Sequence, residues 1–224
     1  MKVKYGMKKI FLSLTLISFA ISGFCQLIKP VKIDSLVTIS LPQGFQKKDT
    51  TDRTVFSANA LYGFMIVVRE PNAKNNTPLK KEKDLNKVLK TYINGIQRQS
   101  DGSSVQNVRD TTVGALKAKT FTLKTDDGGG DIQYRNFVLL YTQDATYTFE
   151  YVYPDNRKDL VKDEYKSYIS SIRLSPELQR NDQYLSNTTG MATITKIEIL
   201  GGSALVIILV IVLIAKRKRR IAIS

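Results

Sequence analysis

The feature that most constrains this chain is an uninterrupted apolar segment near its C-terminal end. Residues 199–215 (ILGGSALVIILVIVLIA) carry no charge, and five basic residues (KRKRR) follow directly. As a helix, this segment spans roughly 25 Å, close to the ~30 Å hydrocarbon core of a bilayer. The stretch from Leu205 to Leu213 is apolar on every side, which excludes an amphipathic helix packed on a globular core. The pattern predicts a transmembrane helix over residues 197–215.

The basic cluster after this segment predicts the orientation of the chain. Lysine and arginine residues next to a membrane span stay on the cytoplasmic side. We therefore expect residues 216–224 inside the cell as a short basic tail, and the preceding domain outside, in the periplasm or the extracellular space. Nuclear-localisation and nucleic-acid-binding segments have a similar composition, but the position directly after an apolar span favours a stop-transfer signal.

The first 25 residues have the pattern of a secretory signal peptide. Four lysines precede Ile10, an apolar run extends from Ile10 to Ile21, and small or weakly polar residues follow. Cleavage after Cys25 would leave Gln26 as the new N-terminus. Two alternatives stay open: acylation of Cys25 as in a lipoprotein, although Phe24 stands where a lipobox has a small residue, and an uncleaved first anchor.

The composition between these two segments excludes several classes of function. The net charge of +14 is concentrated at the ends, with four basic residues before Ile10 and five after Ala215, while all 20 acidic residues lie between. The exported part is therefore only mildly basic, which argues against a nucleic-acid partner. The chain has no histidine, and Cys25 is its only cysteine. This excludes Ser-His-Asp and Cys-His catalysis and removes the commonest zinc ligand.

Residues 26–174 are long enough for one domain with a full core. Alternating apolar residues predict strands, and apolar residues at helical spacing predict two helices. The expected strands are 36–41, 53–58, 62–69, 105–112, 114–125, 132–142 and 146–153. The expected helices are 80–99, with an apolar stripe of Leu85, Val88, Leu89, Tyr92 and Ile96, and 158–172, with a stripe of Val161, Tyr165, Tyr168 and Ile172.

These elements predict an α+β domain: an antiparallel sheet of about six to seven strands flanked by two helices. We expect Tyr92, Ile96, Phe149 and Ile172 to be buried between the helices and the sheet. Residues 175–196 are polar, without period, and contain few large apolar groups. They are therefore expected to form a tether between the domain and the membrane.

Several segments of the domain resemble the PsbP/Mog-type α/β/α sandwich, a family that includes DcrB-like periplasmic proteins. They are VTISLPQGF at 37–45, VGALKA at 113–118 and YKSYISSI at 165–172. The resemblance covers about residues 31–174 and implies an antiparallel sheet with helices on its faces. It also implies a protein that binds other proteins or stabilises assemblies. These motifs mark a loop, a turn and a helix stripe, so the resemblance assigns no functional residue.

Two clusters of residues are candidates for chemistry. Asp126, Asp127 and Asp131 surround three glycines and offer carboxylate oxygens to Ca²⁺. Their spacing does not match an EF-hand loop, and a glycine-rich hairpin tip explains the same residues. Tyrosines at 134, 141, 147, 151 and 153 enrich the last two strands. They suit either a surface for a protein or carbohydrate partner, or a core packed against a helix.

From the sequence we predict a single-pass membrane protein with an extracytoplasmic, non-enzymatic interaction or assembly domain. Its expected partners are the membrane and another protein, and we assign no catalytic residue, cofactor site or metal site. Two alternatives stay open. The first is a carboxylate-based hydrolase or glycan-processing domain, which requires two convergent Asp or Glu side chains in a cleft. The second is a ligand sensor, which requires a partner helix because the nine-residue tail at 216–224 holds no output domain.

Overall fold

The computed structural model describes residues 28–73, 78–126 and 128–186. The predicted signal peptide, transmembrane helix and basic tail, and the last part of the predicted tether, lie outside these residues. Among the helices that the structure describes, none is long and apolar enough to cross a bilayer.

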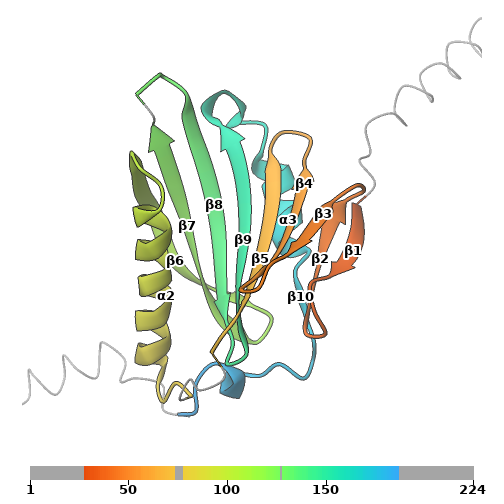
Figure 1. The fold of residues 1–224 in the computed structure, drawn as a ribbon, viewed down its shortest axis with the longest axis vertical. Helices are drawn as coiled ribbons and strands as arrows, with labels where there is room; N and C mark the ends of the chain where they lie inside the picture. The colour runs from red at the N-terminus through yellow and green to blue at the C-terminus, as the bar shows by residue number, and fades with distance from the viewer. Residues whose placement is uncertain (1–27, 74–77, 127, 187–224) are drawn as a thin grey trace, which may run out of the picture.

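A seven-stranded sheet forms the centre of the fold, with the strand order β3-β4-β5-β9-β8-β7-β6 and every pairing antiparallel (Figure 1). Consecutive strands are neighbours in the sheet except β5 and β6, because β6 forms the far edge and β9 lies between β5 and β8. The strands are β3 (Gln46–Asp49), β4 (Thr54–Asn59), β5 (Phe64–Pro71), β6 (Ser103–Val113), β7 (Leu116–Asp126), β8 (Ile132–Tyr141) and β9 (Ala145–Pro154).

A second, smaller sheet packs beside the first. It has the order β1-β2-β10, from β1 (Ile28–Lys32), β2 (Val37–Pro42) and β10 (Arg173–Leu174). Two α-helices, α2 (Glu82–Arg98) and α3 (Lys162–Ser170), flank the large sheet, and two short 3-10 helices, η1 (Asp155–Arg157) and η2 (Arg180–Asp182), lie in connections. Asp34 connects the two sheets: its Oδ2 accepts hydrogen bonds from Arg69 Nε at 2.7 Å and from the Tyr147 hydroxyl at 2.6 Å.

The expected strands and both helices are confirmed, with two differences. The second helix begins at Lys162 rather than at 158, because η1 and a turn occupy residues 155–161. Strands β1, β3 and β10 were not predicted. Strand β3 reads QKKD and is exposed along its whole length, so it has no apolar alternation to reveal it. Charged residues on such an edge strand discourage pairing with other chains.

Helix α2 forms because its apolar residues recur at helical spacing. Leu85, Leu89 and Ile93, at i, i+4 and i+8, are its buried residues and lie on one face. The side chain of Asp84 accepts a hydrogen bond from the Lys81 N–H at 3.0 Å, which satisfies a donor at the start of the helix. Gly102 (φ +67°) in the turn that follows permits the chain to reverse into β6.

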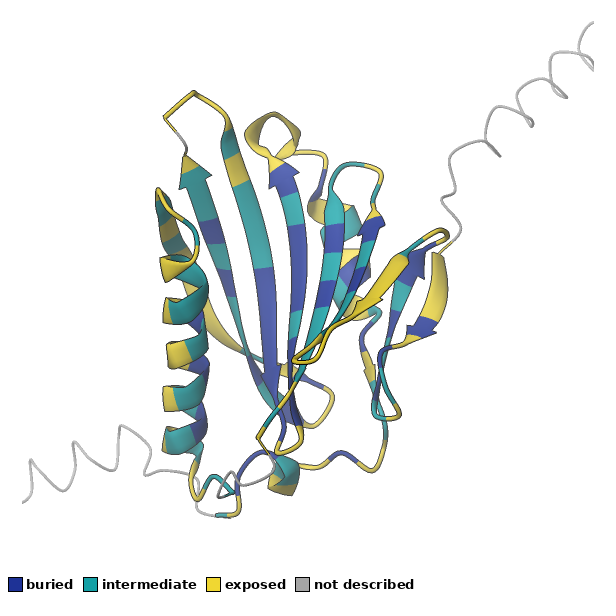
Figure 2. Cartoon of the chain, in the orientation of Figure 1, coloured by how far each residue is buried: buried dark blue, intermediate teal, exposed yellow. Residues whose placement is uncertain are grey.

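The sheet separates two apolar cores (Figure 2). Leu85, Leu89 and Ile93 of α2 pack on Phe121, Leu123, Phe137 and Leu139 on one face. The other face carries a larger core with Tyr147, Phe149, Tyr151, α3 and the small sheet. The prediction that Phe149 and Ile172 are buried is confirmed. The prediction for Tyr92 and Ile96 is wrong: both are half-buried, because Ile93 takes the central position and they flank it.

The segment after β10 is not a free tether where the structure describes it. Leu178 and Tyr184 are buried, in the α3-side and α2-side cores respectively. The buried side chain of Gln183 accepts a hydrogen bond from the Lys117 N–H and donates to the carbonyl oxygens of Lys117 and Tyr141. The expected domain boundary at 174 is therefore wrong. Residues 175–186, here called the strap, belong to the domain, since isolated apolar residues in a polar segment suffice to attach it.

Each helix leaves part of the sheet uncovered. Helix α2 lies over the β6–β8 side of one face, so that no described helix covers β9, β5 and β4 on that face (Figure 1). Helix α3 lies on the opposite face, over the other side of the sheet. The uncovered part beside each helix forms a groove, which we name the α2 groove and the α3 groove.

Candidate functional site

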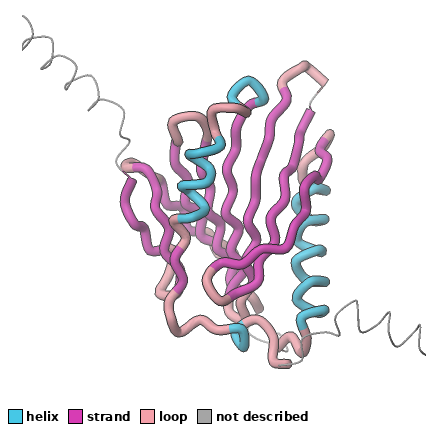
Figure 3. Tube along the Cα trace, turned by 180° about the vertical axis from the view of Figure 1, so that it is seen from behind, coloured by secondary structure: helices cyan, strands magenta, loops and turns pink. Residues whose placement is uncertain are grey.

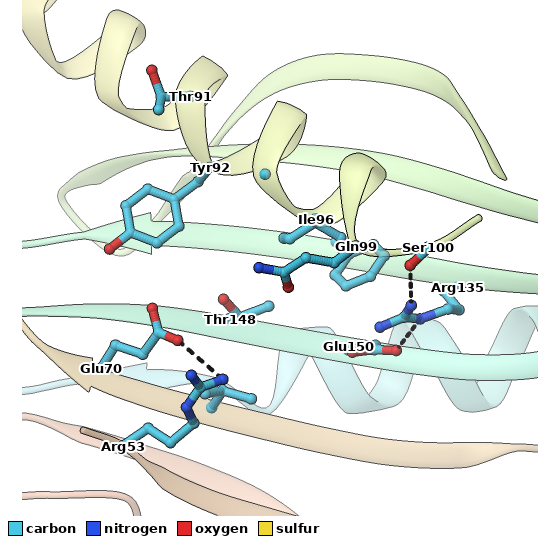
Figure 4. A pocket seen from close by; sticks show the side chains of 13 residues that line it. Arg53, Glu70, Thr91, Tyr92, Ile96, Gln99, Ser100, Arg135, Thr148 and Glu150 are labelled. Atoms are coloured by element: carbon cyan, nitrogen blue, oxygen red, sulfur yellow. Dashed lines mark hydrogen bonds and ion pairs between the residues drawn. The ribbon is translucent and has the colours of Figure 1, made fainter. Parts of the chain in front are cut away.

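The α2 groove contains a cavity of about 490 Å³ between α2 and strands β5, β9 and β8 (Figure 4). Its floor is the sheet and its wall is the helix face that carries Thr91, Tyr92 and Ile96. The volume is in the range of small-molecule and peptide-anchor pockets. The residues that line the cavity are Arg53, Val68, Glu70, Thr91, Tyr92, Gly95, Ile96, Gln99, Ser100, Arg135, Phe137, Thr148 and Glu150.

Register explains why these side chains converge. Side chains of β5 alternate between faces, so that Met65 and Val67 enter the α3-side core while Val68 and Glu70 line the α2 groove. Strand β9 alternates in the same way: Phe149 is in the core, and its neighbours Thr148 and Glu150 face the groove. The tightly packed tyrosine face of β9 therefore fixes which polar residues the groove receives.

One ion pair lies at the helix-proximal side of the groove. Arg135 Nε donates to Glu150 Oε1 at 2.5 Å, and Arg135 also donates to the Ser100 hydroxyl at 3.1 Å (Figure 4). Its guanidinium lies 5.2 Å from the centre of the Phe137 ring, within cation–π range. The Glu150 side chain is 5% exposed and that of Arg135 is 27% exposed. Because Glu150 is buried and Arg135 is half-buried, removing one partner would leave the other's charge largely uncompensated.

A second ion pair lies at the open side. Arg53 approaches Glu70 at 3.6 Å and donates to Asp52 at 2.8 Å. The hydrogen bond from Arg53 lowers the pKa of the Asp52 carboxyl to about 2. The Arg53 side chain is 46% exposed, so solvent screens this pair, and it contributes little to stability. It is accessible to a partner.

The two carboxylates of the groove bear on the alternative of a hydrolase. Glu70 and Glu150 line the same cavity, as a carboxylate mechanism requires. Each is engaged by an arginine. The shared cavity therefore keeps the hydrolase alternative open to a direct test of activity.

The tyrosines singled out in the sequence belong to the core. Tyr141, Tyr147, Tyr151 and Tyr153 are buried, and Tyr134 stacks on Tyr153 at 5.5 Å. Burial and hydrogen bonds to Asp34 and Glu164 raise the pKa values of Tyr147 and Tyr151 well above the ordinary value. Both hydroxyls therefore stay protonated and serve as structural donors. The interpretation of these residues as packing is confirmed.

The aspartate cluster lies where the hairpin interpretation predicts it. Asp126 ends β7 and Ile132 begins β8, with Gly128 (φ +78°) and Gly130 (φ +91°) in the connection. Asp127 is outside the described residues. Over residues 28–73, 78–126 and 128–186, no three His, Cys, Asp or Glu residues are grouped to hold a metal ion.

The α2 groove was not predicted. Its polar residues come from the turn before β4, from β5, β8 and β9, and from α2 and the turn after it, and no two of them form a sequence motif. The only signal in the sequence is the presence of charged residues inside apolar strands, at Arg135 and Glu150.

Comparison with known proteins finds no matching family model and no matching curated protein. Solved structures do resemble the chain. Cyanobacterial PsbP (CyanoP) from Synechocystis sp. PCC 6803 matches 69% of this chain and 96% of its own, at 13% identity and a TM-score of 0.46. LpqN, involved in cell envelope biogenesis of Mycobacterium tuberculosis, matches 67% of this chain and 91% of its own, at 12% identity and a TM-score of 0.43.

A mutant of the protein Mog1 matches 66% of this chain and 96% of its own, at 8% identity and a TM-score of 0.42. The resemblance to the PsbP/Mog-type sandwich that the sequence motifs indicated is thus also found among solved structures. At these identities and scores the likeness concerns the arrangement of strands and helices, and the function of this chain has to be argued from its own geometry.

Proposed function

We propose that this protein is a membrane-anchored, non-enzymatic binding module whose extracytoplasmic domain holds another protein through the α2 groove. The observation that carries the proposal is the uncovered strip of β4, β5 and β9 beside α2. Its side chains include Val55, Ile66, Val68 and Thr148, all half-buried, on a face where the other half of the sheet is packed under a helix.

The composition of the groove suits a protein partner. Arginine and tyrosine are the residue types that contribute most to binding energy at protein interfaces, and the groove offers Arg53, Arg135 and Tyr92. Val68 on the floor and Ile96 on the wall provide apolar surface, and the Arg53–Glu70 pair at the open side provides a polar rim. A partner segment with one apolar anchor and flanking charges of both signs matches this arrangement.

The location rests on the sequence. An N-terminal signal peptide exports residues 26–186, and the span at 197–215 holds them at the membrane surface. The strap ends beside the start of α2, where Leu185 and Ser186 donate backbone hydrogen bonds to Leu79 and Lys80. In the sequence, 10 residues (187–196) separate this point from the predicted span. At ~3.5 Å per residue, the domain stays within about 35 Å of the bilayer.

The test is affinity capture with the full-length protein, purified in detergent from cells of its source, in three versions. Val68→Arg places a charge on the groove floor, and Leu160→Arg places the same charge at a 55% exposed position outside the groove. We expect a partner that the wild-type protein and Leu160→Arg retain and that Val68→Arg loses. Circular dichroism confirms that both variants are folded. Identical captured proteins for all three would contradict the proposal.

The hydrolase alternative has its own test, because Glu70 and Glu150 line one cavity. The full-length protein is incubated with fluorogenic glycosides, together with the variants Glu70→Gln and Glu150→Gln. Our proposal predicts no turnover in any of the three. Turnover that either substitution abolishes, in a folded protein, would identify an enzyme.

A further inference from the structure

The α3 groove lies on the opposite face of the sheet, where α3 leaves β7 and β6 uncovered (Figure 3). It consists of two adjoining hollows of about 530 Å³ and 270 Å³, which share Thr120 and Tyr165. One end is largely apolar, with Val113 and Ile169, and the other is polar, with Arg109 and Asn136. The sharing of two residues makes this one elongated site rather than two separate depressions.

A β-bulge places the arginine in this groove. Gln106 pairs with Thr122 but Arg109 pairs with Thr120, so β6 contains one extra residue between these pairs. Asn107, in the bulge, has φ +55°. Without the extra residue, Val108 would lie opposite Thr120 and Arg109 would point to the other face. The bulge therefore places the guanidinium of Arg109, rather than the side chain of Val108, beside α3.

The charge of the groove is uncompensated. Arg109 and Lys166 are the charged side chains among the described residues of its lining, which include no Asp or Glu. Neither cation forms an ion pair with any described residue. Lys124, farther along β7, lies on the same face, opposite Tyr134, and is also unpaired among the described residues. Two unpaired cations, one in each of the adjoining hollows, favour an anionic ligand.

Neutral hydrogen-bonding groups accompany these cations. The hydroxyl groups of Thr120 and Tyr165 have no hydrogen-bond partner among the described residues, while Thr122 donates to the Asn136 side chain at 2.8 Å. Burial raises the pKa of Tyr165 to about 12, so its hydroxyl is a proton donor at neutral pH. The rings of Tyr165 and Tyr151 pack edge to face, with centroids 5.8 Å apart and an interplanar angle of 61°. Tyr165 lines both hollows.

We propose that the α3 groove binds an anionic saccharide, a sugar that carries a carboxylate. A guanidinium matches the planar, bidentate geometry of a carboxylate, and Lys166 adds a second positive charge. The free hydroxyl groups of Thr120 and Tyr165 match sugar hydroxyls, which both donate and accept hydrogen bonds. The Tyr165 ring and Ile169 provide an apolar surface for the C–H face of a sugar ring. This site is separate from the α2 groove and independent of the function proposed there.

The experiment is calorimetric titration of the full-length protein in nanodiscs of neutral phosphatidylcholine. The probes are trigalacturonate, diglucuronate, neutral maltotriose and inorganic phosphate. We expect at least one of the two uronate probes to bind, and to bind at least about tenfold more tightly than maltotriose and phosphate, because the saccharide engages both the cations and the hydroxyl-binding groups.

Variants assign the binding to the groove. Arg109→Gln is expected to weaken uronate binding about tenfold, and Tyr165→Phe, which removes one hydroxyl, about threefold to tenfold. Lys166→Gln, at an exposed helix position, provides a second test of charge if Arg109→Gln is poorly folded. Lys87→Gln, on the exposed face of α2, is the matched control and is expected to leave affinity unchanged.

Three outcomes would overturn this proposal. They are the absence of uronate binding at millimolar concentration, equal affinity for maltotriose or phosphate, and an equal loss in Lys87→Gln and Arg109→Gln. Capture of a protein partner through the α2 groove is measured separately, so the two proposals fail or succeed independently.

Discussion

The two grooves of this domain arise in the same way but differ in how their charges are compensated. Each is the part of the sheet that a single helix leaves uncovered. In the α2 groove every charged side chain of the lining is in an ion pair with a neighbour (Arg135 with Glu150, Arg53 with Glu70). In the α3 groove Arg109 and Lys166 face the hollow without an acidic partner among the described residues.

This difference indicates which groove contributes to stability and which retains charge for a ligand. A buried ion pair holds its groups in place, and breaking it is costly. An unpaired cation at the surface costs little, and its full charge is available for binding. We therefore expect substitutions of the Arg135–Glu150 pair in the α2 groove to change stability and binding together, and those of the α3-groove cations to change binding alone.

The largest expected effect comes from comparing a position in the α3-side core with one on the wall of the α2 groove. Phe149→Ala empties a fully buried position on the α3 side and is expected to destabilise the domain by about 3–5 kcal/mol. Ile96→Ala, on the half-buried wall of the α2 groove, should cost about 1–2 kcal/mol, because part of its surface is already in water. Urea unfolding of the chain from Gln26 to Ser186 measures both. Equal costs would show that the α2 groove is packed as tightly as the core.

The strap connects both sides of the sheet, and its removal is the next test. A chain that ends at Leu174 loses the burial of Leu178 and Tyr184, each worth roughly 1.5–3 kcal/mol, and three hydrogen bonds of Gln183. After the ordering entropy of the strap is subtracted, we expect a loss of about 3 kcal/mol relative to the chain that ends at Ser186. Unchanged urea midpoints would restore the interpretation of residues 175–186 as a free tether.

Neutralising one charge in each groove tests the comparison directly. Glu150→Gln removes the partner of Arg135 and should destabilise the domain by about 1–3 kcal/mol, less than for a fully buried pair because Arg135 is 27% exposed. Arg109→Gln should change stability by less than about 0.5 kcal/mol. Chemical denaturation of both variants under identical conditions is the measurement. A large cost for Arg109→Gln would mean that it holds the bulge in place rather than a ligand.

The smallest expected effect is a gain. Gly95 lies in α2, and a Cβ added there meets no atom within 4 Å. Gly95→Ala should therefore stabilise the domain by about 0.5–1 kcal/mol through helix propensity. Because Gly95 lines the α2 groove, the same methyl group should weaken partner capture there and leave uronate binding in the α3 groove unaltered. Thermal unfolding and the two binding measurements together check this.

Gly63 provides the contrasting case. A Cβ at this position would lie 2.5 Å from the Val152 carbonyl oxygen and 2.7 Å from the Tyr151 ring. The turn between β4 and β5 therefore needs a glycine because of close approach. This contact arises because β9 pairs with β5 and so lies beside the turn. No local sequence pattern reveals it.

By itself, the sequence determined the elements whose physical cause is local. Period-2 and period-3.6 apolar patterns placed the long strands and both helices, since each pattern creates an apolar face that must be buried. The apolar run at 199–215 with its basic flank predicts a membrane anchor, because an apolar segment of this length must also be removed from water. Strands β1, β3 and β10 lacked such a pattern, and the strap carried too few apolar residues for its packing to be recognised.

The tertiary structure alone decided what lies beside what. Glu150 and Arg135 meet because β8 and β9 pair in one register, and Arg109 reaches the α3 groove because one extra residue in β6 reverses the facing of its side chains. Ile96 is only half-buried because α2 covers only one side of the sheet and Ile96 lies at the border of the α2 groove. Such positions depend on register and on helix placement, which are set by the sum of many contacts far apart in the chain.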